Sequence, residues 1–368
     1  MDSSQFLAQC VSQLLAWYPS HARDLPWRQD REPYHVWLSE IMLQQTRVEA
    51  VKGYYQRFLQ ALPDIDALAR APEEQLLKLW EGLGYYNRVR NLQKAAQQIC
   101  TEYGGVFPDT YESIRKLSGI GPYTAGAIAS ICFEQPTPAV DGNVLRVMAR
   151  LMDDHSCVDL PRVKQQFTDQ LAAVYPAGKC GMLTQALMEL GATVCVPKGA
   201  PGCAACPVSA LCLARKRNTV GMLPVRAEKK QRRIEHRTVF VFLCGDTAAV
   251  RKRENRGLLA GLWEFPNLEH LCTPEEAIAW AEQMGVQPAA LLQSQERTHI
   301  FTHIEWHMTC YYLRCMRPSL EFVWADCTAL EKQYSLPTAF RLFLPDVLAL
   351  LDETADKPKP EPPESGTV

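Results

Sequence analysis

The chain turns sharply at Leu117-Ser-Gly-Ile-Gly-Pro-Tyr-Thr-Ala125, and the rest of the sequence can be organised around this stretch. Gly119 and Gly121 follow one helical segment and come before a helix that we expect over Thr124 to Phe133. Glycine allows a tight turn, so that bare N–H groups at a helix N-terminus can face an anion such as phosphate. A plain helix–helix turn would use the same glycines.

Helical periodicity extends on both sides of this turn, up to about Arg217. Apolar residues recur there at three- and four-residue steps, and Pro, Gly or Asp stand at the breaks. The expected helices are Val36 to Tyr55, Glu73 to Trp80, Val89 to Tyr103, Ala125 to Phe133, Val144 to Leu151, Leu160 to Tyr175 and Leu183 to Cys195. We therefore assign residues 1–217 to an all-α domain.

The pattern changes after this domain. Charge dominates residues 218–235, which we interpret as an interdomain linker. Short strand-like runs follow within residues 236–351, separated by helical stretches, which indicates a smaller α+β domain. The Pro-rich segment 352–368 is predicted to be disordered. The expected strands are Arg237 to Leu243, Ala248 to Arg251 and Glu305 to Leu313, and the expected helices are Glu275 to Met284 and Thr338 to Leu350.

Composition narrows the function classes. The chain has 368 residues, 47% hydrophobic and 22% charged, so it can bury a core in each domain. Its apolar runs are too short to span a bilayer and its N-terminus lacks signal-peptide features, so we expect a cytoplasmic protein without membrane contact. The net charge is −2, yet residues 198–256 hold 14 Lys and Arg against 4 Asp and Glu. That basic segment fits either phosphate binding or a solvated linker.

Four of the fourteen cysteines are clustered. Cys195, Cys203, Cys206 and Cys212 have the spacing C-x7-C-x2-C-x5-C. Four thiolates this close in sequence can converge on zinc or on an iron–sulfur cluster, and spacing alone does not separate the two. Ordinary buried thiols are the alternative, as for the ten cysteines elsewhere in the chain.

Two acidic residues are candidates for acid–base chemistry. In a helix, Glu40 shares its face with mostly apolar residues, including Val36 and Trp37, so its pKa should be raised and it could donate a proton. Asp141 follows an extended stretch, where it could simply be a helix N-cap. Together the two would form a glycosidase-like pair, in which one acid protonates the leaving group and the other stabilises the oxocarbenium ion.

The remaining motif is Glu81-Gly-Leu-Gly-Tyr-Tyr86. Its aromatic residues follow a glycine loop and come before Arg88 and Arg90. Such residues can wedge between bases or stack on them. Tyrosines that pack a helix turn are the ordinary alternative.

In combination these motifs resemble the MutY family of adenine DNA glycosylases, over nearly the whole chain except the tail. The matching stretches are Leu25-Pro-Trp-Arg28, Trp37-Leu-Ser-Glu-Ile-Met-Leu-Gln-Gln-Thr46, Gly82-Leu-Gly-Tyr-Tyr86, Leu117 to Ala125, Val140-Asp-Gly-Asn-Val144, Gln185-Ala-Leu-Met-Glu-Leu-Gly191 and the four cysteines. The resemblance implies a two-lobed helix–hairpin–helix glycosylase domain with a 4Fe–4S cluster, followed by a Nudix-like domain. It also implies a monomeric base-excision repair enzyme that removes adenine mispaired with 8-oxoguanine or guanine in duplex DNA.

The resemblance also assigns roles to residues. It makes Glu40 the general acid at adenine N7, Asp141 the stabiliser of the sugar cation, Asn143 its positioning residue and Tyr123 an assistant near N7. It places Leu25, Trp27, Arg28 and Gln185 at the adenine pocket, and Gln45 and Tyr85 at the wedge on the lesion side. Main-chain groups at Gly119, Gly121 and Thr124 would hold phosphate with a monovalent cation. Phe301, Thr302 and His303 would read 8-oxoguanine, and the four cysteines would hold the cluster.

The sequence departs from the family pattern at several positions. The segment after Gly261-Leu-Trp-Glu-Phe-Pro266 lacks the acidic pattern that holds magnesium in Nudix hydrolases, so we expect no nucleotide hydrolysis. Thr302 stands where Ser is commoner, and it keeps the hydroxyl donor. The first cysteine interval has seven residues where six is usual. Leu145 replaces a lysine of some relatives, which disfavours DNA crosslinking.

Three alternatives differ in chemistry. An endonuclease III-like lyase needs an amine in the hairpin to form a Schiff base, but Pro122, Tyr123 and Thr124 stand there. A DNA-binding or redox-sensing protein without activity would not need both Glu40 and Asp141. A nucleotide-pool hydrolase would need the missing magnesium pattern.

Overall fold

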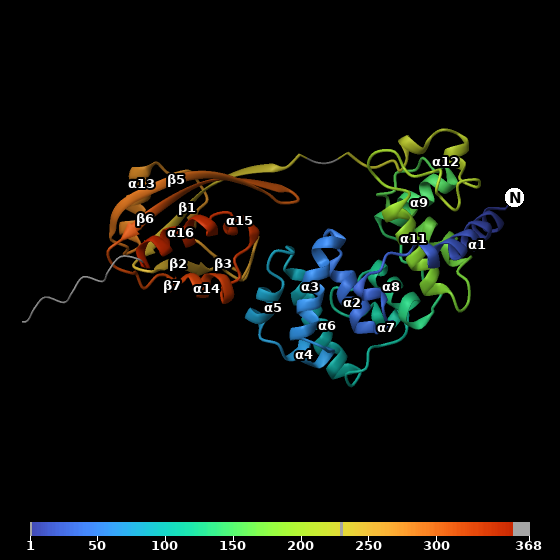
Figure 1. Ribbon diagram of the computed structural model, residues 1–368, viewed down its shortest axis with the longest axis horizontal. Coiled ribbons are helices and arrows are strands. Elements are labelled where there is room, and N and C mark those ends of the chain that lie inside the picture. Colours follow the sequence, from blue (N-terminus) through green and yellow to red (C-terminus); the bar gives the residue numbers. More distant parts are fainter. Residues whose placement is uncertain (1, 229–230, 356–368) are drawn as a thin grey trace, which may run out of the picture. The chain divides into compact units, whose positions relative to one another are not determined.

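The computed structural model describes residues 2–228 and 231–355, and the chain forms two compact units, which are treated separately below (Figure 1). The helical unit comprises residues 1–71 and 87–229, and the sheet unit comprises residues 72–86 and 230–368. Nothing in the sequence patterns indicated that the segment 72–86, which interrupts the helical unit in the sequence, would group with the sheet unit.

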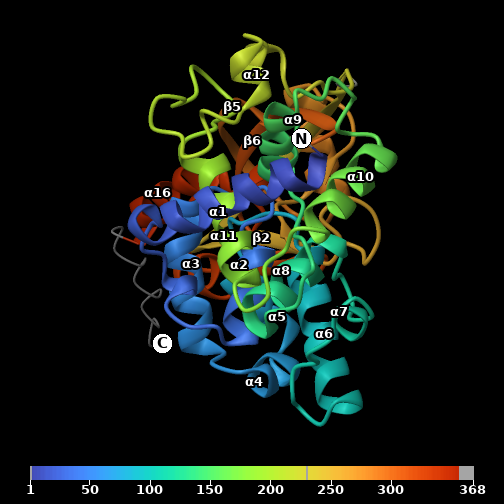
Figure 2. The same cartoon turned by 90° about the vertical axis from the view of Figure 1, so that its right-hand side faces the viewer.

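The helical unit is built almost entirely of helices, as the periodicity predicted (Figure 2). Among the described residues, no helix combines the length and the apolar character that crossing a bilayer requires. The helices are α1 (Ser3–His21), α2 (Pro33–Met42), α3 (Val48–Ala61), α4 (Ile65–Arg70), α6 (Asn87–Glu102), α7 (Tyr111–Ile114), α8 (Pro122–Phe133), α9 (Gly142–Met152), α10 (Pro161–Ala172), α11 (Cys180–Thr193) and α12 (Leu213–Lys216), with 3-10 turns η1 (Pro26–Arg28) and η2 (Val220–Met222).

The core of this unit lies next to α8. Helices α1, α9, α10 and α11 bury one apolar cluster, in which Leu14, Met148 and Phe167 are almost completely inaccessible to solvent. Helix α8 packs against both α11 and α2. The hairpin at the start of α8 therefore lies on a helix that contacts both α2 and α11.

The single helix expected over residues 36–55 is wrong: the chain forms α2 and α3 with a break between them. Gln45 in the break has a left-handed backbone, with φ of 58°. The guanidinium of Arg88 donates to three carbonyl oxygens at the end of α2, at 2.7, 3.2 and 2.7 Å. Because these contacts cap α2 from a residue more than forty positions away, the local sequence did not indicate the break.

The sheet unit contains a mixed sheet with strand order β3-β2-β1-β6-β5, in which β4 pairs with β1 and β7 with β2. The β1–β6 pair is parallel and the other pairs are antiparallel. The elements are α5 (Glu73–Leu79), β1 (Arg233–Cys244), β2 (Thr247–Lys252), β3 (Trp263–Glu264), β4 (Asn267–Leu268), α13 (Pro274–Gln283), β5 (Pro288–Ile300), β6 (Ile304–Cys315), β7 (Val323–Ala325), α14 (Cys327–Lys332), α15 (Thr338–Arg341) and α16 (Leu344–Ala355).

Both faces of the sheet are covered. On β1, Val239 and Val241 point into a cluster with α15 and α16, whereas Phe240 and Phe242 point into a second cluster with α13. This alternation is the period-2 pattern of a strand buried on both faces. It confirms the α+β architecture expected for the C-terminal part.

Several expected boundaries differ from the structure. The strand β1 begins at Arg233, inside the expected linker, and β5 was not anticipated. The expected helix over residues 338–350 is divided into α15 and α16, and α16 continues to Ala355, so the first residues of the expected disordered segment are helical. Residues 229–230 of the linker and 356–368 of the tail lie outside the described residues.

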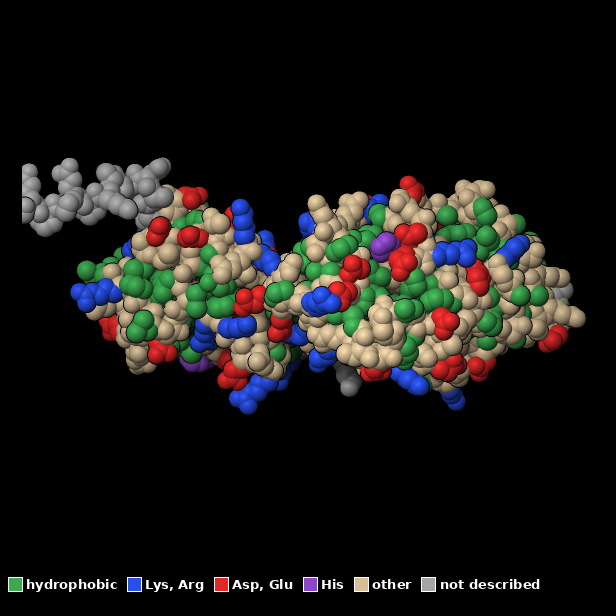
Figure 3. All heavy atoms as spheres, turned by 90° about the horizontal axis from the view of Figure 1, so that it is seen from below, with side chains coloured by type: hydrophobic (Ala, Val, Ile, Leu, Met, Phe, Trp, Pro, Cys, Tyr) green, Lys and Arg blue, Asp and Glu red, His purple; other side chains and the backbone are tan. Residues whose placement is uncertain are grey.

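The basic segment offers less free charge than its composition suggests. Arg217 pairs with Asp153 at 2.9 Å and Arg226 with Asp159 at 3.2 Å. On the face shown in Figure 3, basic and acidic side chains are interspersed. An arginine that already has a carboxylate partner must give it up to hold a phosphate, so the local excess of positive charge overstates the attraction for a polyanion.

Candidate active site

One cavity of about 800 Å³ in the helical unit brings together most of the residues expected at the site. The expected residues that line it are Leu25, Trp27, Arg28, Glu40, Gln45, Gly119, Gly121, Tyr123, Thr124, Asp141, Asn143 and Gln185. They come from η1, α2, the break after α2, the hairpin, α8, α9 and α11. The volume suits a ligand of the size of a nucleoside.

Glu40 projects into this cavity from α2 and is only 6% exposed. The phenol of Tyr123 donates a hydrogen bond to its Oε2 at 2.5 Å. Burial raises the pKa of Glu40 to about 7; the hydrogen bond from Tyr123 opposes that rise, and the negative charge of Asp141 adds to it. The raised pKa that the apolar helix face predicted is therefore confirmed, and this carboxyl group is partly protonated near neutral pH.

Asp141 caps α9 and also lines the cavity, so the two interpretations of this residue are compatible. Its Oδ1 accepts from the backbone N–H groups of Asn143 at 2.9 Å and Val144 at 2.8 Å. Its Oδ2 accepts from the side-chain amide of Asn143 at 2.8 Å. Burial raises the pKa of Asp141 although these hydrogen bonds lower it. The carboxylate is thus held in one orientation at the helix N-terminus.

Asn143 is held in place by residues of α9 and α11. Its Oδ1 accepts from Arg146 Nη2 at 2.8 Å, and the same nitrogen donates to the carbonyl oxygen of Gly191 at 2.7 Å. A Cβ atom at Gly191 would lie 2.6 Å from Asn143 Cβ, so only glycine allows α11 to approach this closely. Arg146 Nε donates to the carbonyl oxygen of Cys195 at 2.8 Å, which ties the Asp141 support to the cysteine loop.

A second glutamate, Glu189, holds the residues of the expected adenine pocket in place. It is fully buried, and its carboxylate pairs with Arg23 and Arg28, each at 2.7 Å. Burial acts to raise its pKa, but the two arginines outweigh burial and the pKa is lowered. Tyr18 donates to Gln185 Oε1 at 2.5 Å. The wall around Leu25, Trp27 and Arg28 is therefore fixed by charge pairs as well as by packing.

The hairpin depends on its glycines. Gly119 has φ of 74°, and a Cβ atom there would lie 2.6 Å from Asn91 Cβ. Gly121 precedes α8 as its N-cap, with Pro122 in the first turn. Thr124 is only 2% exposed, so its side chain is not part of the outer surface, and a phosphate contact at this position would come from the main chain.

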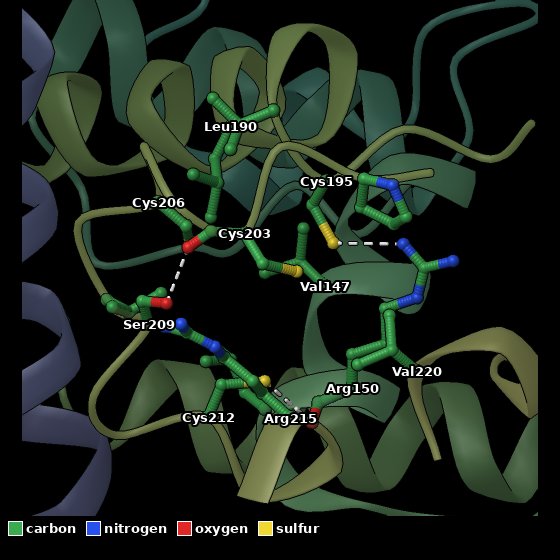
Figure 4. A pocket seen from close by; sticks show the side chains of 14 residues that line it. Val147, Arg150, Leu190, Cys195, Cys203, Cys206, Ser209, Cys212, Arg215 and Val220 are labelled. Atoms are coloured by element: carbon green, nitrogen blue, oxygen red, sulfur yellow. Dashed lines mark hydrogen bonds between the residues drawn. The ribbon is translucent and has the colours of Figure 1, made fainter. Parts of the chain in front are cut away.

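The four clustered cysteines line one small cavity after α11 (Figure 4). Arg150 Nη1 donates to Cys195 Sγ at 3.2 Å, and Cys212 Sγ donates to the carbonyl oxygen of Arg150 at 3.4 Å. Burial raises the pKa of the Cys206 thiol to about 11 against backbone hydrogen bonding, and the charges of the other three cysteines raise it further. Four thiols gathered in this way can lose their protons when a cationic centre binds to them.

The donor set consists of four thiols, which can hold either a zinc ion or an iron–sulfur cluster. Among the described residues, no group of three or more His, Cys, Asp or Glu is close enough to share one metal ion. A single zinc ion draws four thiolates to about 2.3 Å from one centre, whereas an iron–sulfur cube has one thiolate on each iron and keeps them farther apart. Here all four thiols line one cavity.

The residues expected to read the lesion lie in the sheet unit. Phe301, Thr302 and His303 form the turn between β5 and β6, closed by a bond from Phe301 N–H to the carbonyl oxygen of Ile304 at 2.8 Å. Thr302 and His303 are exposed. Tyr85, expected with Gln45 at the wedge, belongs to the sheet unit, and its hydroxyl lies 2.5 Å from Thr302 Oγ1.

Sequence reasoning missed Glu189, Arg23 and Arg146. Glu189 stands four residues after Gln185 and therefore on the same face of α11, in an otherwise apolar stretch. A lone acid in such a stretch, with two arginines flanking Leu25-Pro-Trp27, is the signal that could have identified it.

Comparisons with known proteins agree with this arrangement. Residues 38–159 match the model of the HhH-GPD superfamily of base excision DNA repair proteins, and residues 238–345 match the NUDIX domain. These matches define a class of protein: a helix–hairpin–helix DNA repair enzyme with a NUDIX-like domain added. Among solved structures, a thermostable thymine-DNA glycosylase is 28% identical with a TM-score of 0.54, covering 59% of this chain and 100% of that one.

Curated relatives specify the class further. The adenine DNA glycosylase of Mus musculus is 37% identical over 363 residues, which cover 82% of this chain and 70% of that protein. The adenine DNA glycosylase of Schizosaccharomyces pombe is 34% identical over 393 residues, which cover 86% and 85%. The chain belongs to the adenine DNA glycosylase family. It is accordingly a hydrolase that excises adenine from DNA.

Proposed function

We propose that the enzyme removes adenine paired with 8-oxoguanine or guanine in duplex DNA, and that it acts inside the cell as a monomer without a lyase activity. The observation that carries the chemistry is the pair of carboxyl groups that line one cavity, Glu40 with a pKa of about 7 and Asp141 fixed at a helix N-terminus. One is ready to donate a proton, and the other is aligned to meet a cation.

Glu40 delivers its proton to N7 of the extruded adenine. Neutral adenine is a poor leaving group, because the electron pair of the glycosidic bond must move onto the base. Protonation of N7 lets the base leave neutral, and a positioned acid contributes about 10²–10⁴-fold. Tyr123, whose hydroxyl contacts Glu40 Oε2, holds the carboxyl group in place.

Asp141 then meets the positive charge that develops on the sugar. Its carboxylate stabilises the oxocarbenium ion or bonds to C1′, after which water attacks C1′ and breaks that ester. Two displacements on opposite faces retain the configuration of the sugar. Asn143 and the backbone N–H groups at the start of α9 keep the Asp141 oxygens oriented throughout.

Extrusion delivers the base to these groups. The reacting atoms of adenine are enclosed in the duplex, and a mispair lowers the energy needed to flip the nucleotide out. Leu25 and Trp27 supply apolar walls, and Arg28 and Gln185 supply polar groups for the edge of the base. Main-chain groups at Gly119, Gly121 and Thr124, with a monovalent cation, hold the backbone phosphate.

Recognition of the opposite base is assigned to other residues. Gln45 and Tyr85 fill the space left by the flipped adenine, and both have the left-handed backbone that a loop tip adopts. Phe301, Thr302 and His303 read the oxidised guanine from the β5–β6 turn. The NUDIX-like domain would then serve recognition and would not hydrolyse nucleotides. In this domain, the carboxylate of Glu276 is already engaged in a capping box with Thr273 at the start of α13.

Cys195, Cys203, Cys206 and Cys212 would hold a 4Fe–4S cluster. When bound, the cluster would cross-link the loop after α11 through its iron–thiolate bonds. Iron and sulfide analysis of the purified protein, with its visible absorption, tests this assignment, and four iron atoms per chain are expected. Zinc in place of iron would refute it.

The decisive experiment for the function uses end-labelled A:8-oxoguanine and A:G duplexes. We expect adenine loss, seen as strand cleavage only after alkali, and a larger single-turnover rate constant on A:8-oxoguanine. Light scattering of the same preparation should give the mass of one chain.

The same assay discriminates against a lyase. Lys164 lines the cavity, so the chain does have an amine there that could attack C1′. Borohydride should nevertheless trap little protein–DNA adduct, and Lys164→Arg should cleave as the parent does. Cleavage without alkali, together with efficient trapping that Lys164→Arg removes, would establish the lyase instead.

A further inference from the structure

The segment 72–86, called here the α5 segment, belongs to the sheet unit although α4 and α6 of the helical unit flank it in the sequence. It consists of α5 and the loop that ends at Tyr85 and Tyr86. Among the residues that join it to the rest of the sheet unit is Glu81, to which the proposed mechanism gives no role.

Glu81 connects the α5 segment to the residues before and within α15. Its side chain is 7% exposed. Its Oε1 accepts from the backbone N–H of Leu336 at 2.8 Å, and its Oε2 pairs with Lys78 at 2.9 Å and Arg341 at 2.6 Å. Lys78 also donates to the carbonyl oxygen of Tyr334 at 3.1 Å. Both carboxylate oxygens are therefore engaged in a largely dehydrated site, where such bonds are strongest.

The residues around these contacts include part of the sheet unit's core. Leu336 and Phe340 are completely buried. The ring of Tyr334 packs edge-on against Trp263, with centroids 4.5 Å apart. Glu81 is thus fixed to a part of the molecule that cannot move without disrupting the core.

The loop after Glu81 leads directly to the proposed lesion reader. Gly82, Gly84 and Tyr85 all have positive φ, at 98°, 70° and 49°, and Trp80 Nε1 donates to the carbonyl oxygen of Gly84 at 3.1 Å. The loop is therefore compact and has little freedom between Glu81 and Tyr85. At its end, the Tyr85 hydroxyl lies 2.5 Å from Thr302 Oγ1.

We propose that Glu81 is a positioning residue for lesion recognition. Its ion pair holds the start of the loop so that Tyr85 at the end meets Thr302, and the wedge and the reading turn act as one unit. This inference rests on the proposed function, because it assigns to Glu81 part of the preference for 8-oxoguanine over guanine opposite adenine. Glu81 acts through Tyr85 and needs no contact with DNA.

The test compares single-turnover rate constants on A:8-oxoguanine and A:G duplexes. Glu81→Gln should lower the ratio of the two about tenfold, within the range usual for coupled sites, so that the loss on A:8-oxoguanine exceeds any loss on A:G. Arg341→Gln, at a side chain 42% exposed, should lower the ratio less, and Arg341→Lys should preserve it. Glu74→Gln is the matched control, because Glu74 contacts Lys252 at 3.4 Å in the same unit but is 60% exposed; its ratio should not change.

A cycle with Thr302→Ala tests the route of the effect. If Glu81 acts through the Tyr85–Thr302 contact, the double variant should have nearly the same ratio as Thr302→Ala alone. Additive losses would overturn the proposal, as would an unchanged ratio in folded Glu81→Gln or equal losses on both duplexes. A parent enzyme with no preference for 8-oxoguanine is a different result: it refutes the proposed reading of the oxidised guanine by the β5–β6 turn before any variant is made.

Discussion

Helices α2 and α11 each carry a buried glutamate near the active-site cavity, and the pKa values of the two glutamates are shifted in opposite directions. Glu40 on α2 is 6% exposed, and a tyrosine hydroxyl donates to it. Glu189 on α11 is completely buried, and two arginines pair with it. Burial raises the pKa of Glu40 to about 7, whereas the arginines overcome the same effect and lower the pKa of Glu189.

This difference in pKa suits the two residues to different roles: one acid can donate a proton, and the other can hold neighbouring side chains in place. A buried carboxyl group that forms no ion pair is partly protonated near neutral pH and can give that proton away. A buried carboxylate between two guanidinium groups stays ionised and fixes their positions. In the sheet unit, the buried Glu264 likewise pairs with two guanidinium groups, those of Arg251 and Arg253.

The largest expected effect comes from removing the reactive acid. Glu40→Gln keeps the shape and can still accept the Tyr123 hydrogen bond, but it has no proton to donate. We expect excision to fall about 10³-fold or more, toward the upper end of general acid catalysis. Single-turnover assays measure the loss, and mobility-shift titration should show unchanged affinity for the mispair. Residual activity within tenfold of the parent would mean that another group donates the proton.

The pH profile tests the same acid in the unmodified enzyme. Glu40 must be protonated to act, so the rate constant should fall as pH rises through its pKa of about 7. Between pH 7 and pH 9 we expect a decrease of about 50-fold, because only the protonated fraction is active. Single-turnover rate constants measured at constant ionic strength give the profile. A rate that stays constant over this range would contradict the assignment of Glu40 as the acid.

Stability should reveal the cost of burying this acid. The pKa of Glu40 is higher in the folded chain than its ordinary 4.5, so the folded state binds more protons between pH 4.5 and 7. The stabilisation is complete below pH 4.5 and is lost as pH rises to 7. Relative to the parent, Glu40→Gln should therefore gain about 2–3 kcal/mol in unfolding free energy between pH 4.5 and 8. Denaturant unfolding at both pH values measures this, and a difference independent of pH would refute it.

Much of this architecture could be predicted from local sequence. The alternation along β1, the glycines of the hairpin and the spacing of the cysteines are properties of short stretches, because strand periodicity, turn geometry and donor chemistry operate locally. The break after α2 could not be predicted, because Arg88 caps that helix from a distant part of the chain. Strand β5 was missed since it lies at the sheet edge and is largely exposed, so it lacks an apolar alternation.

The candidate site divides in the same way. The raised pKa of Glu40 follows from its neighbours on one helix face, and the sequence predicted it. The charge state of Glu189 depends on Arg23 and Arg28, which are more than 160 positions away in the chain. A lone acid in an apolar stretch indicates burial, but only the fold shows whether a cation accompanies it.

The smallest expected effect comes from Glu189, the buried glutamate that pairs with two arginines. Glu189→Gln removes the charge that holds Arg23 and Arg28, so the pocket wall loses its order but the reacting groups remain. We expect the rate constant for excision to fall about tenfold, as for a lost positioning interaction, and the pH midpoint near 7 to stay unchanged. Arg31→Gln is the matched control, because Arg31 pairs with Glu134 at 2.7 Å but is 58% exposed; an exposed pair of this kind contributes about 0–1 kcal/mol. Since Glu189 supports and does not react, a shifted midpoint or a loss as large as that of Glu40→Gln would show that the two buried glutamates share the proton transfer.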